Sequence, residues 1–155
     1  MKVFIDTSAL YALVVENDKA HEAAQRIRAG LEMVAEQALT TNYVLLETVS
    51  LLQKRQGYAL AERVGDLVIE QVEVLWVDAA QHREAWRLWK HEHLRGLSLV
   101  DCASFVVMRE SGIRRAFAFD EHFRRAGFEL LMPPADRVAE RRGAYRTARL
   151  RRKNS

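Results

Sequence analysis

The feature that most constrains the fold of this chain is a short apolar run that begins almost at its first residue. Residues 3–5 (Val-Phe-Ile) form strands readily and show no polar alternation, and Asp6, Thr7 and Ser8 follow them directly. A continuous apolar strand is typical of a parallel sheet that is covered on both faces. Because sites in such sheets form at the carboxyl ends of the strands, Asp6 is a candidate site residue. Any of the three polar residues can equally be the N-cap of a following helix.

Length and composition limit the class of protein. A chain of 155 residues with 49% hydrophobic and 29% charged residues fits one ordinary globular domain. The single cysteine, Cys102, excludes an internal disulfide and fits a reducing compartment. The first residues contain no uncharged apolar segment long enough for a signal peptide or a membrane span. We therefore expect a cytoplasmic protein that makes no contact with a membrane.

The basic residues are distributed unevenly along the chain. Residues 137–155 carry a net charge of +7, whereas the residues before them carry −4. The basic segment follows Pro133 and Pro134 and offers too little apolar surface to pack firmly. We therefore expect a folded domain at 1–134 and a mobile basic tail at 135–155. Because an Arg-rich arm attracts polyanions, four of its arginines are candidate substrate-binding residues: Arg141, Arg142, Arg146 and Arg149.

Apolar runs and helical periodicities alternate along the chain. Strands are expected at 3–5, at 33–35 or 38–40, and at 72–77, 115–119 and 128–132, and helices at 9–15, 19–29, 43–56, 59–70, 79–93, 99–110 and 121–126. Gly30 is expected to end the second helix, and Thr41 or Asn42 to cap the third. Strands that alternate with helices indicate βαβ units with right-handed crossovers. The sequence thus predicts an α/β fold with a twisted, mostly parallel sheet of four or five strands between two layers of helices.

One carboxylate interrupts the most apolar helical stretch of the sequence. Glu47 is the only charged residue between positions 43 and 52. Burying a carboxylate without a partner costs on the order of several kcal/mol. Glu47 therefore either faces solvent beside Tyr43, Ser50 and Lys54, or is kept inside for a chemical purpose.

Two further aspartates occur where helices are expected to start. Ser98 and Asp101 have the spacing of a capping box, which accounts for both residues without any chemistry. Asp120 follows an apolar strand as Asp6 does, and it too can cap a helix. If those two strands are neighbours where the strand order reverses, both carboxylates open into one crevice, and Glu47 and Asp101 can line its walls.

Four carboxylates in one crevice would have a specific chemical consequence. They would repel one another and destabilise the fold unless a cation neutralised them. Oxygen ligands select hard ions, so Mg²⁺ or Mn²⁺ is the expected occupant. Such a cluster suits hydrolysis of a phosphodiester, in which metal ions activate water and stabilise the leaving oxygen.

Four segments resemble, in order and spacing, the acidic motifs of the PIN-domain ribonucleases. They are residues 4–10 (FIDTSAL), 43–47 (YVLLE), 96–101 (GLSLVD) and 117–123 (FAFDEHF). The resemblance covers about residues 2–132 and is closest to the small VapC-type toxins of prokaryotic toxin–antitoxin pairs. The sequence departs from the pattern at Ala118, where the fourth motif often has Thr or Ser, so a polar contact that supports Asp120 is expected to be absent.

The resemblance implies an activity, a site and partners. It implies a Mg²⁺-dependent endoribonuclease that cleaves single-stranded RNA, frequently as a homodimer, and a protein antitoxin that blocks the site. The implied catalytic residues are Asp6, Glu47, Asp101 and Asp120. Of these, the three aspartates would hold the metal, while Glu47 would complete the site or position water.

Five other residues allow both a structural and a functional interpretation. Thr7 and Ser8 can hold a metal-bound water or a substrate phosphate, but helix capping explains either hydroxyl equally well. His122 is expected at the surface rather than as a general base. Trp86 and Trp89 are expected in the core rather than as platforms on which RNA bases stack.

Other functions remain compatible with the same residues. A PIN nuclease of RNA processing needs no antitoxin, and the neighbouring reading frame distinguishes it from a toxin. A binding module can keep an acidic cleft without catalysing a reaction. A receiver-type phosphoacceptor domain fits less well, because we find no acidic pair ahead of the candidate aspartate and no Lys after a late strand.

Overall fold

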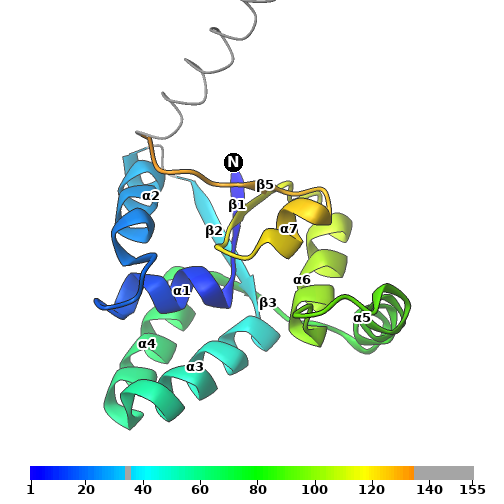
Figure 1. Ribbon diagram of the computed structural model, residues 1–155, viewed down its shortest axis with the longest axis horizontal. Coiled ribbons are helices and arrows are strands. Elements are labelled where there is room, and N and C mark those ends of the chain that lie inside the picture. Colours follow the sequence, from blue (N-terminus) through cyan, green and yellow to red (C-terminus); the bar gives the residue numbers. More distant parts are fainter. Residues whose placement is uncertain (34–35, 135–155) are drawn as a thin grey trace, which may run out of the picture.

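The computed structural model describes residues 1–33 and 36–134, which form a five-stranded sheet surrounded by helices (Figure 1). The strands are β1 (Lys2–Ile5), β2 (Gln37–Thr41), β3 (Glu73–Leu75), β4 (Arg115–Phe117) and β5 (Glu129–Leu130). All neighbouring pairs are parallel and the spatial order is β3-β2-β1-β4-β5. The predicted α/β fold with a parallel sheet is therefore confirmed.

Seven helices cover the sheet within the described ranges. They are α1 (Thr7–Val14), α2 (His21–Met33), α3 (Asn42–Gln56), α4 (Tyr58–Gln71), α5 (Ala79–Glu92), α6 (Leu99–Glu110) and α7 (Glu121–Arg125). Figure 1 shows helices α1 to α4 on one side of the sheet and α5 to α7 on the other. Right-handed crossovers require this division, because the chain moves outward from β1 to β3 and then returns to β4 on the opposite side of β1.

The strand order reverses between β1 and β4. These two strands are hydrogen-bonded neighbours, with Ile5 paired to Phe117 in register. One residue further on, the backbone N–H of Asp6 donates to the carbonyl of Phe117 at 3.0 Å. The carboxyl ends of both strands therefore open at the same point of the sheet edge, where open α/β sheets place their sites.

The core lies on both faces of β1, as its unbroken apolar sequence predicts. Val3, Phe4 and Ile5 are all buried. On the α6 side, residues 101–108 of that helix are buried almost all round, because α6 lies between the sheet and α5. An aromatic cluster in which Phe105 meets the ring of Phe123 edge-on at 5.0 Å completes this half of the core.

Some local expectations are wrong. Helix α2 continues through Gly30 to Met33, because the position packs close to Pro134 and the helix is held by burial of Ala24 and Ile27. Strands β3, β4 and β5 are two or three residues long and so shorter than expected. Trp86 and Trp89 are both exposed, at 46% and 40%, rather than in the core, and their rings lie against each other on α5 with centroids 5.3 Å apart.

Two further expectations concern the basic tail and contact with a membrane. The basic tail at 135–155 lies outside the described residues, and so do its four candidate arginines. In the part of the chain that is described, no helix is both long enough and apolar enough to cross a membrane.

Candidate active site

Asp6 follows β1 and is the N-cap of α1, and Ser8 in the first turn of that helix holds its carboxylate. Its Oδ2 accepts hydrogen bonds from the backbone N of Ser8 at 3.0 Å and from the Ser8 hydroxyl at 2.6 Å. The same hydroxyl accepts a hydrogen bond from the backbone N of Phe119 at 3.0 Å. Ser8 therefore ties the first acidic segment to the loop after β4, and Asp6 itself is only 4% exposed.

Glu47 projects from α3 toward the start of α1. The hydroxyl of Thr7 donates to its Oε2 at 2.6 Å, and Thr48 donates to the Thr7 hydroxyl at 3.3 Å. Thr7 and Thr48 are buried while Glu47 is partly exposed. Glu47 is thus neither a freely solvated surface residue nor a fully buried charge, and Thr7 fixes its direction.

Asp101 occupies the first turn of α6 in the predicted capping box. Its Oδ2 accepts from the backbone N of Ser98 at 2.7 Å and from the Ser98 hydroxyl at 2.8 Å, and the Asp101 backbone N donates to that hydroxyl. The cap explains why α6 begins at Leu99. It also leaves Asp101 only 6% exposed, with a carboxylate whose position is fixed by its own helix.

Asp120 caps the short helix α7 and is hydrogen-bonded to the side chain of His122. Its Oδ1 accepts from the backbone N of His122 at 2.8 Å and from Nδ1 of the same residue at 2.6 Å. The imidazole is only 14% exposed, so the expectation of a surface histidine is wrong. It lies close to Gly96, where a Cβ would approach the ring to 3.3 Å and where the backbone has φ +83°.

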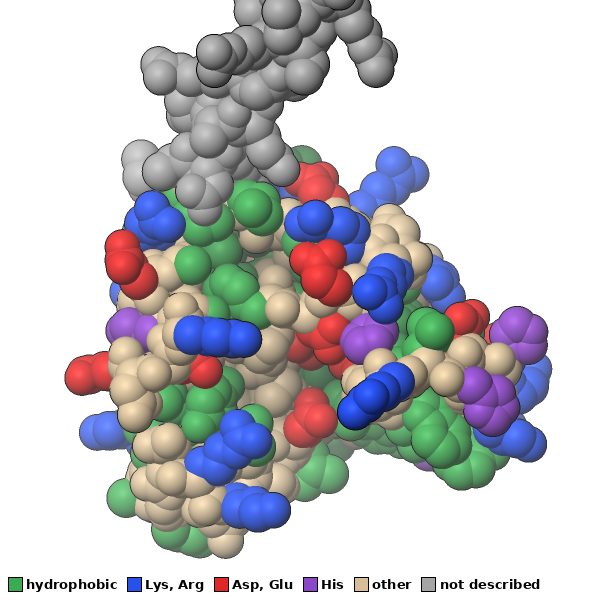
Figure 2. Space-filling model, viewed as in Figure 1, with side chains coloured by type: hydrophobic (Ala, Val, Ile, Leu, Met, Phe, Trp, Pro, Cys, Tyr) green, Lys and Arg blue, Asp and Glu red, His purple; other side chains and the backbone are tan. Residues whose placement is uncertain are grey.

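The charges of these side chains act on one another. Burial is the main cause that raises the pKa of Asp6 to about 7, and the charges of Asp101 and Glu47 raise it further against the lowering effect of the Ser8 hydrogen bonds. Burial also raises the pKa of Asp101, and the charges of Asp120 and Glu47 add to that rise. These influences link all four carboxylates electrostatically. Figure 2 shows acidic side chains gathered in a hollow at the middle of this face, with Lys and Arg on both flanks.

The donor set fits a hard cation. In the described part of the chain, the hydrogen bonds of each carboxylate go to a single oxygen, so the second oxygen of each remains without such a bond. Oxygen ligands of this kind suit Mg²⁺ or Mn²⁺. A cation would offset the cost of burying these charges and the smaller repulsion between them, which together raise the pKa values of Asp6 and Asp101. Among the described residues, no group of three or more His, Cys, Asp or Glu side chains already stands arranged for a metal ion.

Asp6 and Asp120 follow the carboxyl ends of the neighbouring strands β1 and β4, and Asp101 is near enough to Glu47 and Asp120 for their charges to raise its pKa. The structure turns the Thr7 and Ser8 hydroxyls inward, toward Glu47 and Asp6, rather than toward the open side of the hollow. The residue that sequence reasoning missed is His122. Its place two residues after a helix cap, where an imidazole can reach the capping carboxylate, is the signal that could have identified it.

Fold and site together define a class of protein, namely an α/β domain with an acidic site at the switch point of a parallel sheet. The model of the PIN domain family matches residues 3–129. The chain belongs to the PIN-domain family and is a VapC-type member of it.

Known relatives place the chain within this family. It is 37% identical over 132 residues to the 23S rRNA-specific endonuclease VapC20 of Mycobacterium tuberculosis, with 84% of this chain and 98% of that protein covered. The crystal structure of VapC20, described as a toxin that cleaves the sarcin–ricin loop, superposes with a TM-score of 0.78 at 36% identity, covering 84% of this chain and 99% of that one. VapBC2 from Rickettsia felis, solved with a fragment of promoter DNA, has a TM-score of 0.63 at 13% identity over 84% of this chain and 98% of its own, which shows the shared fold alone.

Proposed function

We propose that this VapC-type protein cleaves single-stranded RNA with Mg²⁺, or Mn²⁺, held by Asp6, Asp101 and Asp120. Membership of the VapC branch makes it an endoribonuclease and the toxin of a toxin–antitoxin pair. Beyond this activity, we propose which metal ion is bound and which role each site residue has. The observation that carries this proposal is the pair of buried carboxylates, Asp6 and Asp101. Burial is the main cause that raises the pKa of each, and neighbouring carboxylates raise both further: Asp101 and Glu47 act on Asp6, and Asp120 and Glu47 act on Asp101.

Each side chain has a role that its contacts support. Asp6, Asp101 and Asp120 each direct a carboxylate that is fixed by its own helix cap into the hollow. Glu47, oriented by Thr7, completes the site and positions the attacking water. A bound divalent ion would lower the pKa of that water and stabilise charge on the leaving oxygen.

The substrate is proposed from a relative whose activity is known. VapC20 is a 23S rRNA-specific endonuclease and its structure is described as that of a sarcin–ricin loop cleaving toxin. We infer that ribosomal RNA, and this loop first, is the substrate to test. An enzyme that acts on ribosomes would work in the cytoplasm.

We also infer two protein partners, a VapB-type antitoxin and a second copy of this chain. Structures of VapB–VapC pairs share this fold. Two large apolar side chains on the packed helices α3 and α4 are exposed, Leu46 at 68% and Ile69 at 63%, and we propose that Leu46 lies in the contact between two copies. Light scattering of the purified chain across a dilution series tests the dimer, and a Leu46→Glu variant that stays dimeric would exclude this surface.

The function is tested on ribosomal RNA with and without metal. We expect the wild type to cleave in Mg²⁺ and not in EDTA, and Asp6→Asn and Asp101→Asn to be slower by roughly a hundred- to ten-thousand-fold. Asp78→Asn is a matched control, since Asp78 caps α5 in the same manner but is exposed and belongs to no carboxylate group. Cleavage that is equally fast in EDTA, or in Asp6→Asn, would reject the metal mechanism.

A further inference from the structure

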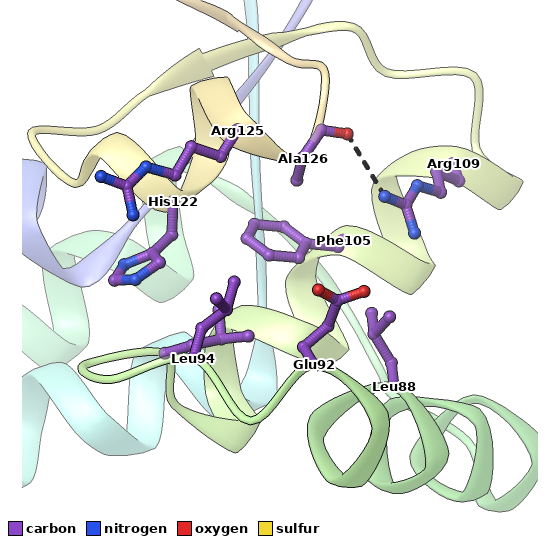
Figure 3. A pocket seen from close by; sticks show the side chains of 9 residues that line it. Leu88, Glu92, Leu94, Phe105, Arg109, His122, Arg125 and Ala126 are labelled. Carbon is purple, nitrogen blue, oxygen red and sulfur yellow. Dashed lines mark hydrogen bonds between the residues drawn. The ribbon is translucent and has the colours of Figure 1, made fainter.

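A pocket that the mechanism does not use lies beside the carboxylates, between α5, α6 and α7. It has a volume of about 170 Å³. Its walls combine apolar side chains, among them Leu88 and Leu94, with two arginines, the imidazole of His122 and one carboxylate, Glu92. Figure 3 shows His122 and Arg125 extending from α7 on one side, with Leu94 opposite them.

His122 connects this pocket to the candidate active site. Its Nδ1 donates to Asp120 at 2.6 Å, and the ring lines the pocket. Its other nitrogen, Nε2, is buried and has no hydrogen-bond partner in the described part of the chain. A buried polar atom without a partner is costly, so a small rotation of the ring that brings Nε2 to a ligand group in the pocket would be favourable.

Arg125 supplies a cation at the same wall. The other arginine of the pocket, Arg109, already donates to the carbonyl of Ala126 at 3.2 Å and lies over the ring of Phe128. Arg125 has no ion pair or hydrogen bond among the described residues. Its neighbour Arg124 lies near Glu121 at 3.7 Å and is not among the residues that line the pocket. Arg125 is therefore the cation that remains available to an anionic ligand.

We propose that this pocket is a nucleotide subsite for single-stranded RNA, next to the bond that is cleaved. The base lies against Leu94 and pairs with Nε2 of His122, while Arg125 binds an adjacent phosphate. Proteins recognise single-stranded RNA in this way, with splayed bases held by apolar or aromatic surface and phosphates held by cations. The inference rests on the proposed nuclease function, because continuity with the carboxylates through His122 favours RNA over a peptide of the antitoxin.

Binding is measured first, in a background that does not cleave. A fluorescent single-stranded oligoribonucleotide of mixed sequence is titrated with Asp6→Asn and with double variants that add Arg125→Gln, Arg124→Gln or Leu94→Ser. Arg125→Gln should raise the Kd about tenfold and lower the slope of log affinity against log salt by roughly 0.7. Leu94 is 42% exposed, so Leu94→Ser should fold normally and raise the Kd roughly three- to tenfold. Arg124→Gln removes the same charge from the same helix and should change the Kd less than about twofold.

A second measurement separates this subsite from the proposed function. The wild type, Arg125→Gln and Arg124→Gln, each with Asp6 intact, cleave a randomised RNA pool whose ends are sequenced. We expect the base preference at one position beside the cut to weaken in Arg125→Gln and to persist in Arg124→Gln. Equal binding and equal preference in both arginine variants would overturn the subsite while leaving the nuclease intact. Loss of antitoxin binding without loss of RNA binding would assign the pocket to the antitoxin instead.

Discussion

The hydroxyl of Thr7 donates a 2.6 Å hydrogen bond to Oε2 of Glu47, a residue 40 positions away in the sequence. Thr7 is the first residue of α1 and is buried, whereas Glu47 lies on α3 at the rim of the hollow. The bond couples the start of one helix to the only acidic residue of the site that does not cap a helix. Glu47 therefore depends on Thr7 for an orientation that the other three obtain locally.

Replacing Thr7 by Val tests this dependence. The substitution keeps the shape of the side chain but removes the donor, so Glu47 loses its direction, and we expect RNA cleavage to fall roughly ten- to a hundred-fold. The free energy of unfolding should fall by about 1 kcal/mol. Thr40→Val is the matched control, because the buried Thr40 bonds the carbonyl of Ile5 instead. It should lose similar stability and keep its activity, and equal activity losses in both variants would assign Thr7 to the scaffold alone.

Replacing Asp6 by Asn should stabilise the metal-free protein in a pH-dependent way. Burial raises the pKa of Asp6 from 3.8 to about 7, so between these values the folded chain holds a proton that the unfolded chain has lost. Stability is therefore lost as the pH rises through this window, and the full cost remains above it. Asn caps helices as well as Asp does.

We expect Asp6→Asn in EDTA to gain about 2 kcal/mol in the free energy of unfolding near pH 8 and nothing near pH 4, from urea denaturation. The gain is smaller than the pKa difference alone implies, because water and neighbouring groups adjust around the ionised form. Asp78→Asn, the exposed cap, should show no such dependence. A gain that is the same at both pH values would contradict the prediction.

Mg²⁺ should stabilise the folded chain by binding to the carboxylates. At a concentration about a hundred times its Kd, a ligand adds about 2.7 kcal/mol, which corresponds to a rise in Tm of roughly 5–10 °C. Thermal unfolding in MgCl₂ and in KCl of equal ionic strength measures this. Asp101→Asn should abolish most of the rise, and an undiminished rise in that variant would place the metal elsewhere.

Two substitutions of His122 should separate its two nitrogens. In His122→Asn the amide nitrogen stands near the position of Nδ1 and can still donate to Asp120, whereas in His122→Gln it stands near that of Nε2. Both variants lose buried ring surface, so stability does not discriminate them. Affinity for Mn²⁺, measured by electron paramagnetic resonance, should stay within about threefold in His122→Asn and fall about tenfold in His122→Gln. The reverse order would show that the ring does not position Asp120.

Removing the basic segment should change how RNA binding depends on salt. Residues 137–155 carry a net charge of +7, and each phosphate contact they make adds roughly 0.7 to the slope of log affinity against log salt. We compare the full chain with one that ends at Pro134, both carrying Asp6→Asn. We expect a shallower slope for the shorter chain. Identical slopes would show that the segment does not bind RNA and would reject four of its arginines as RNA-binding residues: Arg141, Arg142, Arg146 and Arg149.

The sequence alone determined the features that arise from nearby residues. The apolar run of β1 requires burial on both faces, and the caps at Asp6, Asp101 and Asp120 are each made with a residue two or three positions away. Alternation of strands and helices then leaves a parallel sheet as the expected arrangement. Local chemistry therefore predicted the parallel sheet and the helix caps, whereas the set of four site carboxylates also rested on the resemblance to the PIN family.

Only the tertiary structure decided the features that depend on distant partners. Thr7 meets Glu47 because β1 and β2 are neighbours, and His122 is buried because α7 packs against α6 and the loop at Gly96. Gly30 stays within a helix because packing overrides its low helix propensity. The pKa of Asp6 rises chiefly because the completed fold excludes water from it, and exclusion of water is a property of the whole packed chain that no short segment of sequence contains.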